Sequence, residues 1–191
     1  TPANMPKSYL PTEPAVIRAL TVRFSPSKQV RIRVKALEAT GHDTSKVELI
    51  IMGGTWSAIP SSYQTSYIRA CYHALNETKG LVKSLEAEQK LNESAPHRCV
   101  GLTLETRPDW ITEKEIKKMR RFGCTRVEMG VQSLSDEVHN LCKRGHGVAE
   151  VITATELLRN AGFKVVYHMM LNFPGSNPKQ DVEMFKKLFS N

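Results

Sequence analysis

The sequence has no long hydrophobic run and no secretory signal pattern. A helix that crosses a bilayer needs roughly 20 consecutive apolar residues, and no segment approaches that length. The first residues also lack the basic segment and hydrophobic stretch of a signal peptide. We therefore expect a cytoplasmic protein without a membrane partner.

Cysteine is scarce, and the few cysteines are poorly placed for a metal site. Four are present, far apart and without a C-x-x-C pair: Cys71, Cys99, Cys124 and Cys142. This spacing predicts neither a disulfide framework nor a metal centre. Buried small hydrophobic residues are the default for such cysteines in a cytosolic chain. We therefore assign no metal ligand to this sequence.

Acidic residues are outnumbered, with 19 Asp and Glu against 27 Lys and Arg, which gives a net charge of +8. A basic surface favours a polyanion such as nucleic acid, although a basic surface that binds nothing is the alternative. Two segments carry the excess charge. The first contains Arg18, Arg23, Lys28, Arg31, Arg33 and Lys35, and the second Lys117, Lys118, Arg120 and Arg121. Either can follow a phosphate backbone or lie solvated.

Hydrophobic periodicity predicts strands that alternate with helices, which indicates a parallel sheet in an α/β fold. Residues 1–27 are expected to form an extended loop and a basic segment, because four prolines fall within residues 1–14. The predicted strands are 47–52, 99–104, 126–131 and 163–170. The predicted helices are 28–40, 62–76, 81–91, 112–123, 136–142, 148–160 and 178–189. Four strands are too few to close a barrel, so we expect an incomplete one.

Polar residues follow several of these strands, where the carboxyl ends of parallel strands share one edge. Gly53, Gly54 and Thr55 end the first strand, and two adjacent glycines can bring N–H groups to a carboxylate or phosphate. A tight turn without a ligand is the alternative. Glu105 and Arg107 end the second strand on one side of the chain. They either bind a polar ligand or form a structural ion pair.

The third and fourth strands end in further polar side chains. Glu128 and Gln132 alternate on the third strand, where they either bind a ligand or pair with Arg126 and neighbouring strands. His168 ends the fourth strand as a ligand-binding residue or a satisfied core histidine. The turn 143–146 is basic and either meets phosphate or is solvated. Lys46 precedes the first strand at the opposite end and, on position alone, is a surface lysine.

Read together, these segments resemble one family, the catalytic subunit of Elongator, a radical S-adenosylmethionine (SAM) enzyme that carboxymethylates tRNA uridine. The resemblance spans nearly the whole sequence, in segments 5–14, 41–42, 46–55, 101–109, 123–133, 144–146 and 162–170. It implies a TIM-like partial (β/α) barrel over residues 28–191, with a C-terminal acetyltransferase domain that this sequence does not contain. The Glu-x-Gly-x-Gln-Ser element at 128–133 by itself indicates only a radical SAM enzyme.

The resemblance also implies a chemistry. A [4Fe-4S] cluster cleaves SAM, and the deoxyadenosyl radical takes hydrogen from the methyl group of acetyl-coenzyme A (acetyl-CoA). The resulting carbon radical adds to carbon 5 of the wobble uridine. The SAM pocket would contain Gly53, Gly54, Thr55, Glu105, Arg107, Gln132 and His168. Lys46 would serve acetyl-CoA, and Arg18, Arg23, Arg31, Arg33 and Lys35 would bind tRNA.

The family's three cluster cysteines precede the segment that matches Thr1, and none of the four cysteines here corresponds to them. The resemblance therefore implies a core fragment that is inactive by itself. Elongator-type partner subunits are further expected partners. Two alternatives remain, a protein lysine acetyltransferase subunit and a tRNA-binding scaffold with a vestigial radical SAM site.

Overall fold

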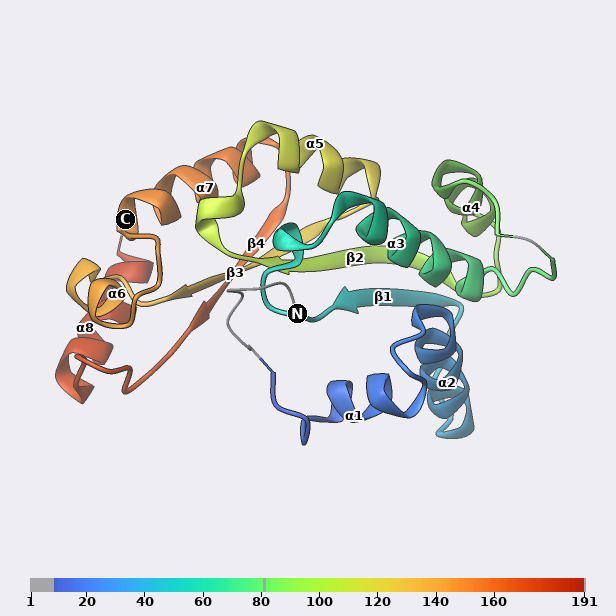
Figure 1. The fold of residues 1–191 in the computed structure, drawn as a ribbon, viewed down its shortest axis with the longest axis horizontal. Coiled ribbons are helices and arrows are strands. Elements are labelled where there is room, and N and C mark those ends of the chain that lie inside the picture. Colours follow the sequence, from blue (N-terminus) through green and yellow to red (C-terminus); the bar gives the residue numbers. More distant parts are fainter. Residues whose placement is uncertain (1–8, 81, 191) are drawn as a thin grey trace.

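Figure 1 shows the computed structural model, which describes residues 9–80 and 82–190. The strands are β1 (Lys46–Ile51), β2 (Arg98–Thr106), β3 (Arg126–Gln132) and β4 (Lys164–Met169). The helices are α1 (Pro14–Thr21), α2 (Pro26–Ala39), α3 (Ser61–Leu75), α4 (Leu85–Asn92), α5 (Glu113–Arg121), α6 (Asp136–Leu141), α7 (Val148–Asn160) and α8 (Pro178–Phe189), with short 3-10 turns η1 (Trp56–Ala58) and η2 (Pro108–Trp110). Within these ranges, no helix combines the length and apolarity needed to cross a membrane.

The strands of the described ranges form one parallel sheet in the order β1-β2-β3-β4. One row of neighbours runs across it from Ile50 through Thr103 and Arg126 to Lys164. All the carboxyl ends therefore lie at one edge of the sheet, which we call the mouth. The predicted parallel α/β arrangement is confirmed.

The hydrophobic core lies between the sheet and helices α3, α5 and α7, which cover the same face (Figure 1). Leu102 and Leu104 on β2 are fully buried and share this core with Ile68 of α3, Met119 of α5 and Leu158 of α7. Burial of each such side chain contributes roughly 2 kcal/mol. The buried apolar side chains of the strands thus face the helices, and the side chains between them face the opposite side of the sheet.

The opposite face of the sheet is more polar and more open. Ile50 and Val166 are 47% and 38% exposed there, and side chains at alternate positions share this face, since successive residues of a strand point to opposite sides. They include Glu105 and His168, which lie near the carboxyl ends of β2 and β4, and Glu128 of β3, which is the cross-strand neighbour of Glu105. A barrel-type core with an accessible inner face results.

The predicted extended loop and basic segment over residues 1–27 contain helical structure that the sequence did not predict. Helix α1 occupies Pro14–Thr21, and α2 begins at Pro26, before the predicted start. Proline is well tolerated in the first turn of a helix, where its missing N–H has no partner to lose. Ala19 is buried against the rest of the protein, so tertiary packing holds this short helix. Residues 1–8 lie outside the described ranges.

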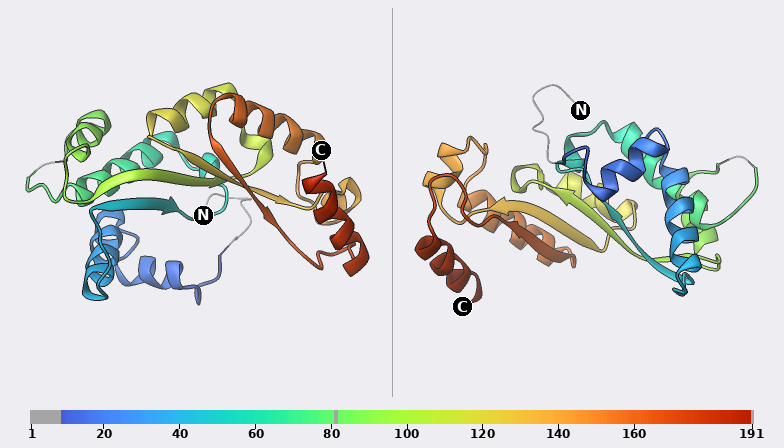
Figure 2. Two further views of the ribbon diagram at one scale, coloured as in Figure 1. Left: turned by 180° about the vertical axis from the view of Figure 1, so that it is seen from behind. Right: turned by 90° about the horizontal axis from the view of Figure 1, so that it is seen from below.

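The helix predicted over 81–91 begins later, at Leu85. Ser84 is its N-cap and accepts a hydrogen bond from the Ala87 N–H at 3.2 Å. This cap moves the start of the helix four residues along the chain. Figure 2 shows α4 near one end of the molecule and α8 at the other.

Candidate functional site

Glu105 is the centre of the cluster at the mouth. One carboxylate oxygen, Oε2, accepts hydrogen bonds from the Tyr9 hydroxyl (2.6 Å), the Gly54 N–H (3.2 Å) and the Gly53 N–H (3.4 Å). The other, Oε1, lies 3.5 Å from Nδ1 of His168. The ends of β1, β2 and β4 therefore converge on one carboxylate, together with the segment that precedes α1.

The titration behaviour of this cluster follows from its contacts. Burial would raise the pKa of Glu105, but His168, Tyr9 and the two glycine N–H groups outweigh it, and the pKa is lowered. Glu105 in turn raises the pKa of His168, against burial and with help from Glu128. Burial and Glu105 raise the pKa of Tyr9. Glu105 is therefore an anion, and His168 is favoured as a cation.

The charges continue in a row across the open face of the sheet. His168 Nε2 lies 2.8 Å from Glu128, and Nε of Arg126 lies 3.5 Å from the same carboxylate. Arg126 also lies 3.7 Å from Glu48 on β1. Of the two readings of Glu128, pairing with Arg126 and a neighbouring strand is the one that the structure shows. Because positive and negative groups alternate along this row, each charge has an opposite charge beside it, which offsets the free-energy cost of placing several charges on one face of the sheet.

The turn after β1 directs two backbone N–H groups toward Glu105. Gly54 has a φ of +76°, a conformation that favours glycine. A side chain at Gly53 would meet nothing within 4 Å, so the space beside it is open. Thr55 is buried at the start of η1. The two N–H groups already bind a carboxylate, that of Glu105, which demonstrates that the turn suits this group.

A second cluster lies at the carboxyl end of β3. Arg107 is held by Asp109 through two hydrogen bonds of 2.9 Å and does not pair with Glu105. Arg144 donates to the Gly130 carbonyl at 3.2 Å. A side chain at Gly130 would lie 3.0 Å from the Gln132 amide nitrogen and 3.5 Å from Arg144. Gln132 and Arg144 are thus neighbours.

Arg107 joins this second cluster through the basic turn. A side chain at Gly145 would lie 3.0 Å from the Arg107 guanidinium. Burial and the charge of Arg107 lower the pKa of Arg144, so two guanidinium groups act on one region. Such a pair suits a carboxylate or phosphate. The predicted SAM-pocket residues therefore fall into two clusters, one around Glu105 and one around Arg107 and Gln132.

A buried histidine pair supports the second cluster. The rings of His139 and His146 lie 4.9 Å apart, and His139 Nε2 donates to the Val131 carbonyl at 3.0 Å. Both ring nitrogens of His146 are buried without a hydrogen-bond partner among the described residues. Burial lowers the pKa of His146 to about 4, so the ring is neutral near neutral pH.

The sequence did not indicate a role for Tyr9, and it did not decide whether Arg144 contacts a ligand or is solvated. Tyr9 contacts Glu105 across 96 positions of sequence, and no local pattern gives such a partner. Arg144 had only the basic turn 143–146 as a signal, which fits a solvated loop equally well.

The remaining predicted residues lie away from the mouth. Lys46 is the exposed first residue of β1, at the opposite end of that strand from Gly53. Arg31 and Lys35 lie one turn apart on α2, Arg33 lies between them on another face, and Arg18 and Arg23 belong to α1 and the turn after it. Their roles stay predictions.

The described residues provide no iron–sulfur ligands. Within 9–80 and 82–190, no group of three His, Cys, Asp or Glu side chains is arranged to hold a metal ion. Burial raises the pKa of Cys71 and Cys124 and disfavours the thiolate that a metal needs. An iron–sulfur cluster therefore does not fit the residues that the structure describes.

Comparisons with known proteins identify the family of this chain. The Radical SAM superfamily profile matches residues 27–188. The chain is 51% identical over 188 residues to the tRNA uridine(34) acetyltransferase of Methanocaldococcus infernus, covering 98% of this chain and 35% of the relative. It is 38% identical over 185 residues to Elongator complex protein 3 of Saccharomyces cerevisiae, covering 97% of this chain and 33% of the relative. The chain thus spans about a third of these relatives.

Solved structures give the same result. The M. infernus Elp3 structure with an N-terminal deletion superposes with a TM-score of 0.87 at 51% identity, covering 91% of this chain and 40% of that chain. Escherichia coli coproporphyrinogen III oxidase (HemN), described as a radical SAM enzyme, has a TM-score of 0.53 at 18% identity, covering 93% and 36%, and supports the fold alone. The partial barrel is confirmed, and the chain belongs to the radical SAM superfamily.

Proposed function

We propose that this chain is the radical SAM core of an enzyme that carboxymethylates carbon 5 of the tRNA wobble uridine, with SAM bound at the mouth. The observation that carries this is the convergence of three strand ends on Glu105, whose carboxylate accepts the Gly53 and Gly54 N–H groups. The relatives named as tRNA uridine(34) acetyltransferases support tRNA as the substrate.

The residues present fit the polar parts of SAM. The N–H groups of Gly53 and Gly54 suit a carboxylate, as their contact with Glu105 demonstrates. The Glu105 carboxylate accepts hydrogen bonds and is suited to the ligand's ammonium or ribose hydroxyl groups. Arg107 offers a guanidinium once it leaves Asp109. When bound, SAM supplies the radical chemistry of this superfamily, and these residues bind and orient it.

Acetyl-CoA is the proposed donor of the two-carbon unit. Its assigned residue, Lys46, lies at the far end of β1 from the mouth. A role for Lys46 therefore requires a subsite separate from the SAM pocket. Elongator-type subunits remain proposed partners, supported by the relatives named Elongator complex protein 3.

The test uses the full-length protein, reconstituted anaerobically with its cluster. We expect deoxyadenosine to form from SAM only when tRNA and acetyl-CoA are both present, together with carboxymethylated uridine. Deoxyadenosine formation without tRNA would contradict the assignment of tRNA as the substrate. A protein that binds tRNA yet forms no deoxyadenosine would instead be a scaffold, and acetylation of protein lysine alone would indicate an acetyltransferase.

A further inference from the structure

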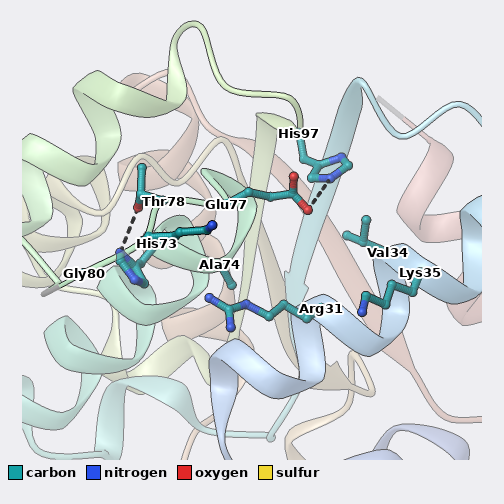
Figure 3. A pocket seen from close by; sticks show the side chains of 10 residues that line it. Arg31, Val34, Lys35, His73, Ala74, Glu77, Thr78, Gly80 and His97 are labelled. Carbon is teal, nitrogen blue, oxygen red and sulfur yellow. Dashed lines mark hydrogen bonds and ion pairs between the residues drawn. The ribbon is translucent and has the colours of Figure 1, made fainter.

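A cavity of about 600 Å³ lies between α2 and the turn that follows α3, away from the mouth. Arg31, Val34 and Lys35 of α2 form one wall (Figure 3). The end of α3 and residues 77–80 form the other, and His97, just before β2, also lines the cavity. This volume is typical of pockets that bind small ligands or parts of larger ones.

Three cationic side chains line this cavity, Arg31, Lys35 and Lys79. Arg31 and Lys35 are four residues apart, so they lie on the same face of α2. In Figure 3 the Arg31 side chain extends from α2 toward Ala74 on the opposite wall. Within residues 9–80 and 82–190 none of the three makes an ion pair. Their charge is available to a ligand.

The acidic groups nearby are directed elsewhere. Glu77 also lines the cavity, but its carboxylate lies 3.6 Å from Nε2 of His97, as the dashed line in Figure 3 marks. Glu38 lies 3.8 Å from the same nitrogen. His97 thus faces both carboxylates, and the cations keep an excess of positive charge over the rest of the cavity.

A buried carboxylate fixes the wall that carries Lys79. Glu88, 1% exposed, accepts hydrogen bonds from the Asn76 amide (2.8 Å) and the Lys83 N–H (2.9 Å), at the two ends of the turn. His73 lies 2.9 Å from it. Glu88 thus holds Asn76 and Lys83, which lie on either side of Lys79 in the sequence, while Lys79 itself lines the cavity together with α2.

We propose that this cavity, which we call the α2 pocket, binds a backbone phosphate of RNA through Arg31, Lys35 and Lys79. The inference rests on the proposed function, which supplies an RNA substrate. A phosphodiester presents anionic oxygens to several cations at once, and Thr78 and His73 line the same cavity with polar groups. The nucleotide to be modified must lie at the mouth. The pocket would hold the tRNA at a second point, remote from the mouth.

The proposal divides the predicted basic segment into two kinds of residue. Arg31 and Lys35 line the pocket, whereas Arg33 lies on a different face of the same helix and does not. All three are exposed and carry the same charge. Arg33 is therefore a matched control for Arg31, because it is the same residue type on the same helix and differs only in the face on which it lies.

The experiment measures the dissociation constant of the full-length protein for a tRNA transcript at several salt concentrations. The variants are Arg31→Gln, Lys35→Gln, Lys79→Gln, their triple combination and Arg33→Gln, each checked for an unchanged thermal unfolding midpoint. Each pocket variant should lower the slope of log K against log salt by about 1. The triple variant should bind at least about tenfold more weakly near 0.1 M salt. Arg33→Gln should change the slope less than Arg31→Gln.

Equal effects of Arg31→Gln and Arg33→Gln would overturn the pocket and favour a diffuse basic band. Adenosine 3′,5′-bisphosphate and inorganic phosphate are added as competitors. Displacement of tRNA by either one at micromolar concentration would overturn the assignment to RNA and favour a small phosphate compound. Wild-type protein that fails to bind tRNA would contradict the proposed function itself. Variants that bind like wild type, in a protein that still modifies tRNA, would contradict the pocket alone.

Discussion

The two ends of this molecule treat charge differently. At the mouth, Glu105, His168 and Arg107 all have partners within the protein. In the α2 pocket, Arg31 and Lys35 have none among the described residues. A ligand at the mouth must therefore exchange partners with protein groups, which gives geometric selectivity. A ligand at the α2 pocket gains contacts without such an exchange, which suits a sequence-independent contact to phosphate.

The largest effect should come from Glu105→Gln, which keeps the shape of the side chain and removes its charge. A hydrogen bond to a charged group contributes about 1.5–3 kcal/mol, so SAM should bind roughly 10- to 150-fold more weakly. The measurement is equilibrium binding of SAM to the reconstituted full-length protein. Glu48→Gln is the matched control, since Glu48 lies at the far end of the same charged row. Equal losses in both variants would mean that the mouth is not a localised site.

A smaller effect should come from two glycines with similar backbone conformations. Gly145 and Gly41 have φ values of +75° and +82°. Alanine at either position should cost about 1 kcal/mol in unfolding free energy, measured by urea denaturation. A side chain at Gly41 meets nothing within 4 Å, whereas one at Gly145 lies 3.0 Å from Arg107. Only Gly145→Ala should also weaken SAM binding, and equal binding by both variants would place Arg107 outside the site.

The sequence predicted the sheet more fully than it predicted the site. Alternating apolar runs such as Leu102 and Leu104 define strands directly, because burial depends on local periodicity. Gly53, Gly54 and Glu105 were placed together because carboxyl ends of parallel strands share an edge. That argument predicts at which edge of the sheet these residues lie, but it does not predict which side chains they contact. It left Glu105 and Arg107 as possible partners, although they pair with His168 and Asp109.

Contacts between distant segments could not be predicted from local patterns. Tyr9 lies in a proline-rich segment with no periodicity, yet it bonds Glu105. The α2 pocket depends on Lys79, which reaches its position through a turn tied to the buried Glu88. Helix α1 was missed for a related reason, since packing of Ala19 and not helix propensity holds it. Tertiary contacts decide each of these cases.

The smallest effect concerns pH and two histidines near the mouth with opposite behaviour. Glu105, helped by Glu128 against burial, raises the pKa of His168 above its ordinary value of 6.5. The contribution of protonated His168 to stability is therefore complete below about pH 6.5, and it is lost as the pH rises through the raised pKa of His168. Burial instead lowers the pKa of His146 to about 4. The folded state consequently loses stability as the pH falls from about 6.5 toward 4.

Urea denaturation of His168→Gln and His146→Gln over the range of about pH 5 to 9 separates these contributions. The stability difference between wild type and His168→Gln should shrink as the pH rises, because the wild-type imidazolium loses its proton. Wild type should lose more stability than His146→Gln on acidification, because the unfolded wild type gains a proton on His146 that the buried ring does not take up in the folded state. The effects are modest since His168 is 36% exposed, so solvent screens its ion pairs. Parallel pH profiles for wild type and His168→Gln would mean that His168 is not held as a cation between the two carboxylates, and the charged row at the mouth would then end at Glu128.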